Sequence, residues 1–113
     1  MEKIVEQGIL YDFYGELLTA HQRQIYEDVV FHDLSLSEIA QSNGISRQGV
    51  HDLLKRCDKI LTDYENKLHL VKKFVYVRQR AAQIKALSAG EGCEDGQTMS
   101  RIGRLAEEIL EEL

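Results

Sequence analysis

Two helix-start signals separated by a single glycine constrain the fold of this chain more than any other feature. Ser35 and Glu38 have the spacing of a capping box, in which the serine hydroxyl accepts from the Glu38 amide and the glutamate side chain reaches back to the cap. Gly44 tolerates the positive φ of a tight turn, and Ser46 is a second N-cap. The pattern predicts a short helix over 36–42, a sharp turn, and a further helix that begins after Ser46.

The side chains around this turn have the sizes that two packed helices need. Ala40 is small where the first helix must let the second approach, and Ile45 is expected to fill the corner between them. Val50 and Leu53 are placed to pack the second helix against the first. These residue types at these separations predict a helix-turn-helix. A plain helical hairpin with no nucleic-acid role stays open, because geometry does not fix function.

The rest of the chain also predicts helices. Apolar residues recur at intervals of three and four over 5–18 and 99–113, as along one face of a helix. Thr19 has the position of an N-cap for a helix over 20–32. The 113 residues include no proline and only 8 glycines, whereas all-β proteins need many turns. We therefore predict an all-α fold, with a helix-turn-helix core and additional C-terminal helices.

The helical pattern in the second half of the chain is too long for one helix, so we expect it to be interrupted. No strong stop signal occurs from 47 to about 88, yet one helix of that length would be unusual, so we expect a break near Asn66–His69. Over 70–77, β-branched and aromatic residues would suit a strand, but helical spacing favours a helix. Three glycines and three acids predict a loop over 89–97, after which Ser100 is expected to cap the last helix.

We predict two domains, a helix-turn-helix domain over 1–65 and a helical extension over 66–113. Charged residues are distributed unevenly along the chain. The net charge by segment is −5 over 1–33, +1 over 34–60, +4 over 61–89 and −5 over 90–113. The basic segment over 34–89 could bind phosphate, contact the acidic ends of the same chain, or bind a partner protein. No apolar run approaches the ~20 residues of a membrane span, and the start lacks a signal-peptide pattern, so we expect a cytoplasmic protein.

If the second helix of the motif reads nucleic acid, polar side chains near its start would do so. Arg47 could pair with a phosphate or a guanine edge, and Gln48 with adenine. Asp52 on the same surface would repel phosphate, and an ordinary solvated surface is the alternative. The candidate nucleic-acid-binding residues are Arg47, Gln48, His51, Lys55 and Arg56.

No catalytic constellation stands out. The histidines are scattered, and no pair has a metal-ligand spacing such as HExxH. Cys57 and Cys93 are far apart and are read as two reduced thiols. We therefore expect no metal, no cofactor and no enzymatic activity.

The helix-turn-helix segment, Leu34–Ala40 followed by Gly44–Val50, resembles region 4 of bacterial sigma factors. Over about residues 10–75, the chain resembles the bacterial YlxM family more closely than it resembles sigma region 4. The matching features are Tyr11-Asp12-Phe13-Tyr14, Leu17-Leu18-Thr19, Gln22-Arg23, Asp33 through Ala40, Ser46-Arg47-Gln48, Lys55-Arg56 and Tyr64 through Leu70. Two departures are Gly49, where alanine is expected, and His51, where an aromatic residue is expected.

This resemblance implies a role that the residue pattern alone does not. Genes of the YlxM family lie beside those for the signal recognition particle GTPase and its receptor. It implies a non-enzymatic accessory or regulatory protein of that targeting pathway, which contacts the particle's RNA, its GTPase, or both. Two alternatives stay open: a transcription regulator that binds duplex DNA as a homodimer through residues 99–113, and a protein-interaction adaptor without nucleic-acid contact.

Overall fold

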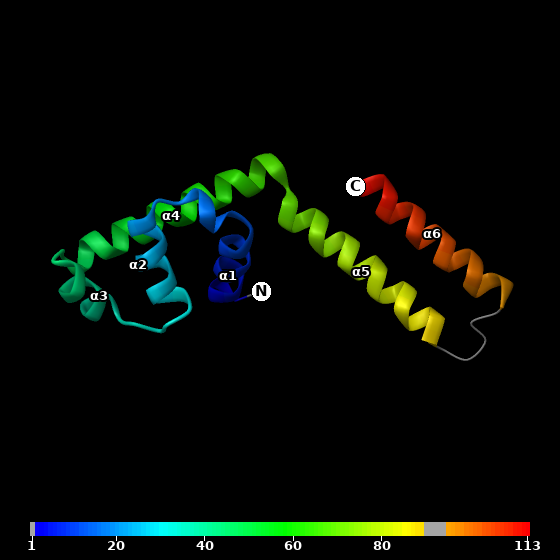
Figure 1. Ribbon diagram of the computed structural model, residues 1–113, viewed down its shortest axis with the longest axis horizontal. Coiled ribbons are helices and arrows are strands. Elements are labelled where there is room, and N and C mark those ends of the chain that lie inside the picture. Colours follow the sequence, from blue (N-terminus) through cyan, green and yellow to red (C-terminus); the bar gives the residue numbers. More distant parts are fainter. Residues whose placement is uncertain (1, 90–94) are drawn as a thin grey trace. The chain divides into compact units, whose positions relative to one another are not determined.

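The computed structural model describes residues 2–89 and 95–113, and these residues contain helices and no strand. In chain order the elements are α1 (Lys3–Tyr14), the 3-10 turn η1 (Gly15–Leu17), α2 (Ala20–Val30), α3 (Leu36–Asn43), α4 (Arg47–Leu68), α5 (Leu70–Ala89) and α6 (Gly96–Glu112) (Figure 1). The all-α prediction is confirmed, including the helix rather than a strand over 70–77. The contacts divide the chain into two compact units, Met1–His69 and Leu70–Leu113.

In the first unit α1, α2 and α3 all pack against α4 (Figure 1). The centre of the core joins three helices, because Ile25 of α2, Ile39 and Ala40 of α3 and Val50 of α4 form one buried cluster. Removing such side chains from water is the main force that holds the helices together. Helix α2 therefore packs against both helices of the helix-turn-helix.

The local signals around the motif act as predicted. The Ser35 hydroxyl accepts from the Glu38 amide at 3.1 Å, and the Ser35 amide donates to the Glu38 carboxylate at 3.4 Å. Thr19 makes a matching capping box at the start of α2, and Ser46 accepts from the Gly49 amide at 2.9 Å. These bonds satisfy amides that would otherwise have no partner at a helix start.

Ile45 is the exception in the turn. The sequence suggested that it fills the corner between the helices, but its side chain is exposed. The corner is closed by the backbone instead, because the Ile45 amide donates to the Ala40 carbonyl at 3.1 Å. The tight turn brings the two helices together without a side-chain plug.

The expected break near residues 66–69 is present. His69 ends α4 with φ 56° and ψ 29°, and its amide donates to the Glu65 carbonyl at 2.8 Å. A single residue in the left-handed region prevents α4 from running on into α5. Neither helix is long and apolar enough to cross a membrane, and the same holds for every helix within residues 2–89 and 95–113.

The second unit is an antiparallel hairpin of α5 and α6 (Figure 1). An ion pair joins the helices, with 3.4 Å between Arg80 Nε and Glu108 Oε2. The start of α6 was predicted wrongly: Asp95, not Ser100, is the N-cap, and its carboxylate accepts from the Gln97 amide at 3.0 Å. The predicted loop over 89–97 is also too long at both ends, and residues 90–94 of it lie outside the described part of the chain.

Candidate nucleic-acid interface

The turn between α3 and α4 sets the position of the candidate surface. Gly44 has φ 65° and ψ 30°, and its amide donates to the Ala40 carbonyl. The Asn43 side-chain amide closes the same helix end by donating to the Ile39 carbonyl at 2.8 Å. With the end of α3 and the start of α4 both capped, the first turns of α4 are held at a fixed angle to α3.

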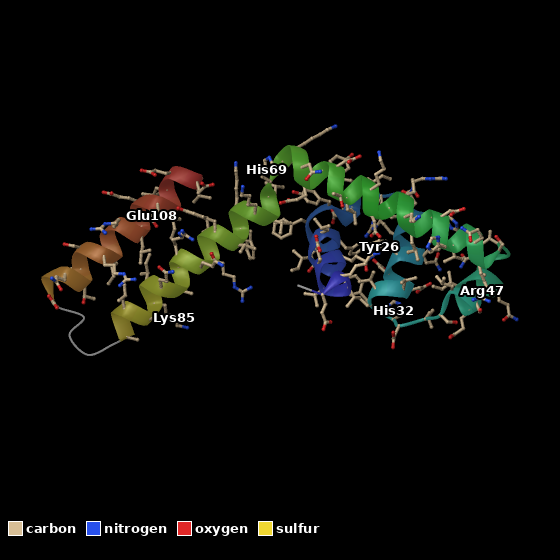
Figure 2. The ribbon with its side chains drawn as sticks, turned by 180° about the vertical axis from the view of Figure 1, so that it is seen from behind. Tyr26, His32, Arg47, His69, Lys85 and Glu108 are labelled. Carbon is tan, nitrogen blue, oxygen red and sulfur yellow. The ribbon has the colours of Figure 1, made fainter. Side chains whose placement is uncertain are left out.

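Four of the predicted residues lie on one exposed side of α4, near its start. Arg47, Gln48 and His51 line an open hollow of about 390 Å³ together with Leu36 of α3. Lys55 follows His51 by four residues and therefore lies on the same side one turn later. Arg47 stands at the first position of the helix, at the outer edge of the unit (Figure 2). We call Arg47, Gln48, His51 and Lys55 the α4 surface.

Arg56 is not part of this surface. It is exposed, but it follows Arg47 by nine residues, which is about two and a half turns of an α-helix. Its side chain therefore leaves α4 on the side opposite to Arg47. The structure groups four of the five predicted residues and separates the fifth.

Asp52 modifies the α4 surface more than its sequence position suggested. Gln48 donates a hydrogen bond to its carboxylate at 2.9 Å, and the His51 ring nitrogen lies 3.8 Å from the same oxygen. A base that pairs with Gln48 would have to displace this internal bond. The carboxylate also lowers the positive potential of the α4 surface, and this reduces attraction for phosphate.

Local packing explains why residue 49 is a glycine. A Cβ at this position would lie 3.2 Å from the Ser46 hydroxyl oxygen, which is tighter than most contacts of that kind. The same hydroxyl is the cap of α4, because it accepts from the Gly49 amide. Glycine therefore leaves room for the cap at the start of the helix that presents the α4 surface.

Behind the α4 surface, tyrosine–carboxylate pairs fix α4 to the other helices. The Tyr26 hydroxyl of α2 donates to Asp58 at 2.7 Å, and the Gln7 amide of α1 donates to both oxygens of the same carboxylate at 3.0 Å. Burial of Tyr26, and next its bond to Asp58, raise the pKa of its hydroxyl. One turn before the end of α4, Tyr14 donates to Glu65 at 2.5 Å.

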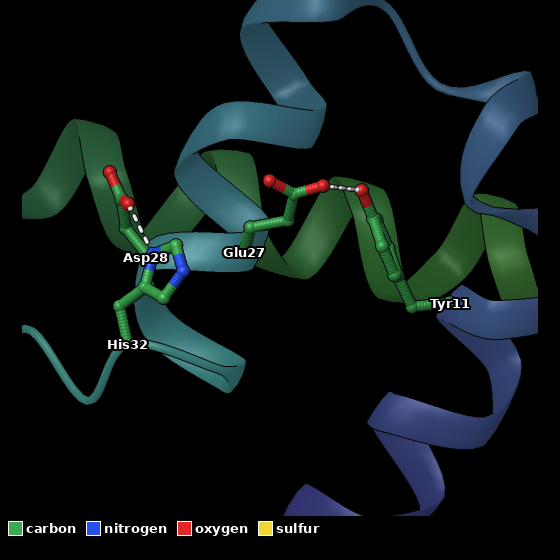
Figure 3. Close-up of polar contacts among 4 residues, drawn as sticks. All are labelled: Tyr11, Glu27, Asp28 and His32. Carbon is green, nitrogen blue, oxygen red and sulfur yellow. Dashed lines mark hydrogen bonds and ion pairs between the residues drawn. The ribbon is translucent and has the colours of Figure 1, made fainter.

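A further pair joins α1 to α2. The Tyr11 hydroxyl donates to Glu27 (Figure 3). The Tyr11 ring also stacks on Tyr26, with 5.6 Å between the ring centroids. Burial raises the pKa of Tyr11, and Glu27 adds to the effect. Just beyond the end of α2, His32 pairs with Asp28 of that helix at 3.1 Å (Figure 3). The long-range pairs could not be predicted from local sequence patterns, because their members are 16 to 51 residues apart.

Comparison with known proteins places this architecture among its relatives. The model of the UPF0122 family, described as "Putative helix-turn-helix protein, YlxM / p13 like", matches residues 1–98. A UPF0122 protein of Acetivibrio thermocellus is 40% identical over 116 residues, which cover 98% of this chain and 99% of the relative. A UPF0122 protein of Clostridium botulinum is 52% identical over 73 residues, covering 65% of this chain and 67% of the relative. One from a Geobacillus species is 40% identical over 107 residues, covering 95% and 97%.

Proposed function

The chain belongs to the UPF0122 family of helix-turn-helix proteins, and on that premise we propose that it binds nucleic acid through the α4 surface. Its physiological role is that of an accessory or regulatory protein of the signal recognition particle pathway, with the particle's RNA as the ligand. The pathway rests on the resemblance to the YlxM family.

The observation that carries nucleic-acid binding is the grouping on α4. Arg47, Gln48, His51 and Lys55 lie together at the exposed start of the second helix of the motif, and the first three line a hollow with Leu36. This is the part of a helix-turn-helix that approaches a nucleic-acid groove. Arginine and lysine contact phosphate, and glutamine and arginine can read base edges.

The protein has no catalytic role in this proposal. Its histidines do not converge: His32 pairs with Asp28 on α2, while His51 lies on the α4 surface. In the described residues, no group of three His, Cys, Asp or Glu side chains could hold a metal ion. The residues of the α4 surface are suited to binding a polyanion rather than to proton transfer.

Binding is tested by fluorescence anisotropy with labelled signal recognition particle RNA and a random DNA duplex, at about 50 and 200 mM salt. We expect tighter binding to the RNA, and an affinity that falls steeply with salt because phosphate contacts release counterions. Arg47→Ala should lower the salt slope by about one, whereas the matched control Arg56→Ala on the opposite side of α4 should leave it unchanged. Equal effects of the two substitutions would contradict binding through the α4 surface.

A transcription regulator that binds duplex DNA as a homodimer is the second candidate, favoured by the same exposed start of α4. Such dimers place their two reading helices about 34 Å apart. A sequence-specific duplex footprint with two half-sites one helical turn apart would select this function over RNA binding.

A protein adaptor is the remaining alternative, and the acidic segment over 1–33 favours it. The signal recognition particle GTPase is then the partner, and binding to it should be unchanged by alanine at Arg47 and Lys55. No binding to RNA or duplex at either salt concentration, together with direct binding to the purified GTPase, would replace the nucleic-acid proposal with this one.

A further inference from the structure

Helix α6 carries two adjacent apolar rows, and the hairpin uses one of them. The inner row faces α5 and contains the buried or half-buried residues Ile102, Leu105 and Ile109. A second row runs beside it with intervals of four, three, four and three residues, which is the heptad spacing of a helix–helix seam. We call it the outer row of α6, and it consists of Met99, Gly103, Ala106, Leu110 and Leu113.

The large side chains of the outer row are exposed in the hairpin, and Ala106 between them is half-buried. The exposed fractions of its large side chains are 55% for Met99, 71% for Leu110 and 85% for Leu113. At its centre, a Cβ added to Gly103 would meet nothing within 4 Å. Packing on α5 therefore does not require a glycine there, whereas close approach of another helix is favoured by the small residues Gly103 and Ala106.

The outer row is complementary to itself when two α6 helices run antiparallel. Met99 and Gly103 precede a point midway between Arg104 and Leu105 by the same distances that Leu110 and Ala106 follow it. A two-fold axis at that point pairs Met99 with Leu110 and Gly103 with Ala106, and Leu113 lies beyond the paired residues. Each end of the contact would receive Met99 from one chain and Leu110 from the other. The centre would hold the small residues of both chains.

The charges on α6 favour the same direction. Its first half carries Arg101 and Arg104 and no acid, and its second half carries four glutamates and no basic residue. An antiparallel pair therefore sets the basic half of each helix beside the acidic half of the other. A parallel pair would bring eight glutamates together at one end, which is unfavourable.

We infer that the outer row of α6 is the contact surface for a second copy of this chain, with the two α6 helices antiparallel. This goes beyond nucleic-acid binding, because it concerns a helix that carries none of the α4 surface. One helix pair is a small interface, so the dissociation constant should be on the order of micromolar.

Sedimentation of the full chain at increasing concentration tests this inference. We expect the 13.0 kDa monomer to give way to a species of twice that mass. Leu110→Gln should raise the dissociation constant by about a hundredfold, because the two-fold axis places the change in the contact twice. The matched control Leu17→Gln makes the same change at an exposed leucine of the other unit and should have no effect. A monomer at every concentration, or equal effects of both substitutions, would overturn the inference.

Cysteine cross-linking tests the direction of the helices. Cys93 is first replaced by serine, while Cys57 is buried and can remain. A chain with Met99→Cys mixed with a chain with Leu110→Cys should then form a disulfide between the two. Identical cysteines would be about 16 Å apart in the antiparallel pair, too far for a disulfide. Preferential linkage of two Met99→Cys chains would overturn the antiparallel arrangement. Binding of RNA or DNA by either variant has no bearing on these outcomes.

Discussion

Gly44 offers a sharp test of how the turn of the helix-turn-helix is held. Its φ of 65° lies in the left-handed region, and a Cβ built on it would meet no atom within 4 Å. Gly44→Ala therefore introduces no clash, and only the backbone conformation opposes it. That conformation costs an alanine roughly 1–2 kcal/mol, partly offset by the lower entropy of the unfolded chain. We expect a net loss of about 1 kcal/mol, and a smaller loss for Gly44→Asn.

His69 provides a control with the opposite sign. It is also left-handed, with φ 56°, but already carries a side chain. His69→Gly should release a similar strain and stabilise the first unit by up to about 1 kcal/mol. Both changes can be measured by urea unfolding followed through near-UV tyrosine circular dichroism, because four of the five tyrosines lie in the first unit. A Gly44→Ala chain as stable as the parent, or a His69→Gly chain destabilised as much as Gly44→Ala, would show that left-handed strain does not decide stability at these two positions.

Three further outcomes are expected. Burial raises the pKa of the Cys57 thiol from 9.0 to about 11, so the unfolded chain loses this proton first as the pH rises. About 3 kcal/mol of unfolding free energy should therefore disappear between about pH 9 and 11, and Cys57→Ala should remove that part of the loss measured by urea unfolding. Tyr26→Phe removes a donor to Asp58, which keeps its bonds from Gln7, and should lower the same free energy by about 1–2 kcal/mol; no change would show that the bond does not stabilise the fold. Asp52→Asn preserves an acceptor for Gln48 but removes the charge. It should tighten RNA binding roughly threefold at low salt and less at high salt in the anisotropy titration, and unchanged binding would place the ligand elsewhere.

The helix boundaries around the motif could be predicted because their signals are local. Ser35, Ser46 and Thr19 each bond to an amide three residues ahead, and Gly44 acts on the backbone at its own position. The break at His69 was placed from helix length alone, because no glycine marks the end of α4. At α6 the predicted cap was Ser100, but Asp95 caps the helix instead.

The candidate site could be predicted in part. The identity of the exposed residues at the start of α4 follows from the helical period once Val50 is assigned to the core. The bond from Gln48 to Asp52 has the ordinary spacing of four, yet no sequence pattern decides whether such a pair forms or stays solvated. Arg56 was grouped with Arg47 by its charge, and the helical period separates them.

Local sequence signals are enough to predict the all-α class, the two helices of the motif and the turn between them, because caps, glycine and apolar period act within a few residues. Which apolar side chains are enclosed depends instead on tertiary packing. Leu17 and Met99 have helical spacing but are exposed, whereas Tyr26 is enclosed with its hydroxyl on a carboxylate 32 residues away. Periodicity marks a face of a helix, but burial depends on which other helix covers that face, and that is settled by contacts between distant parts of the chain.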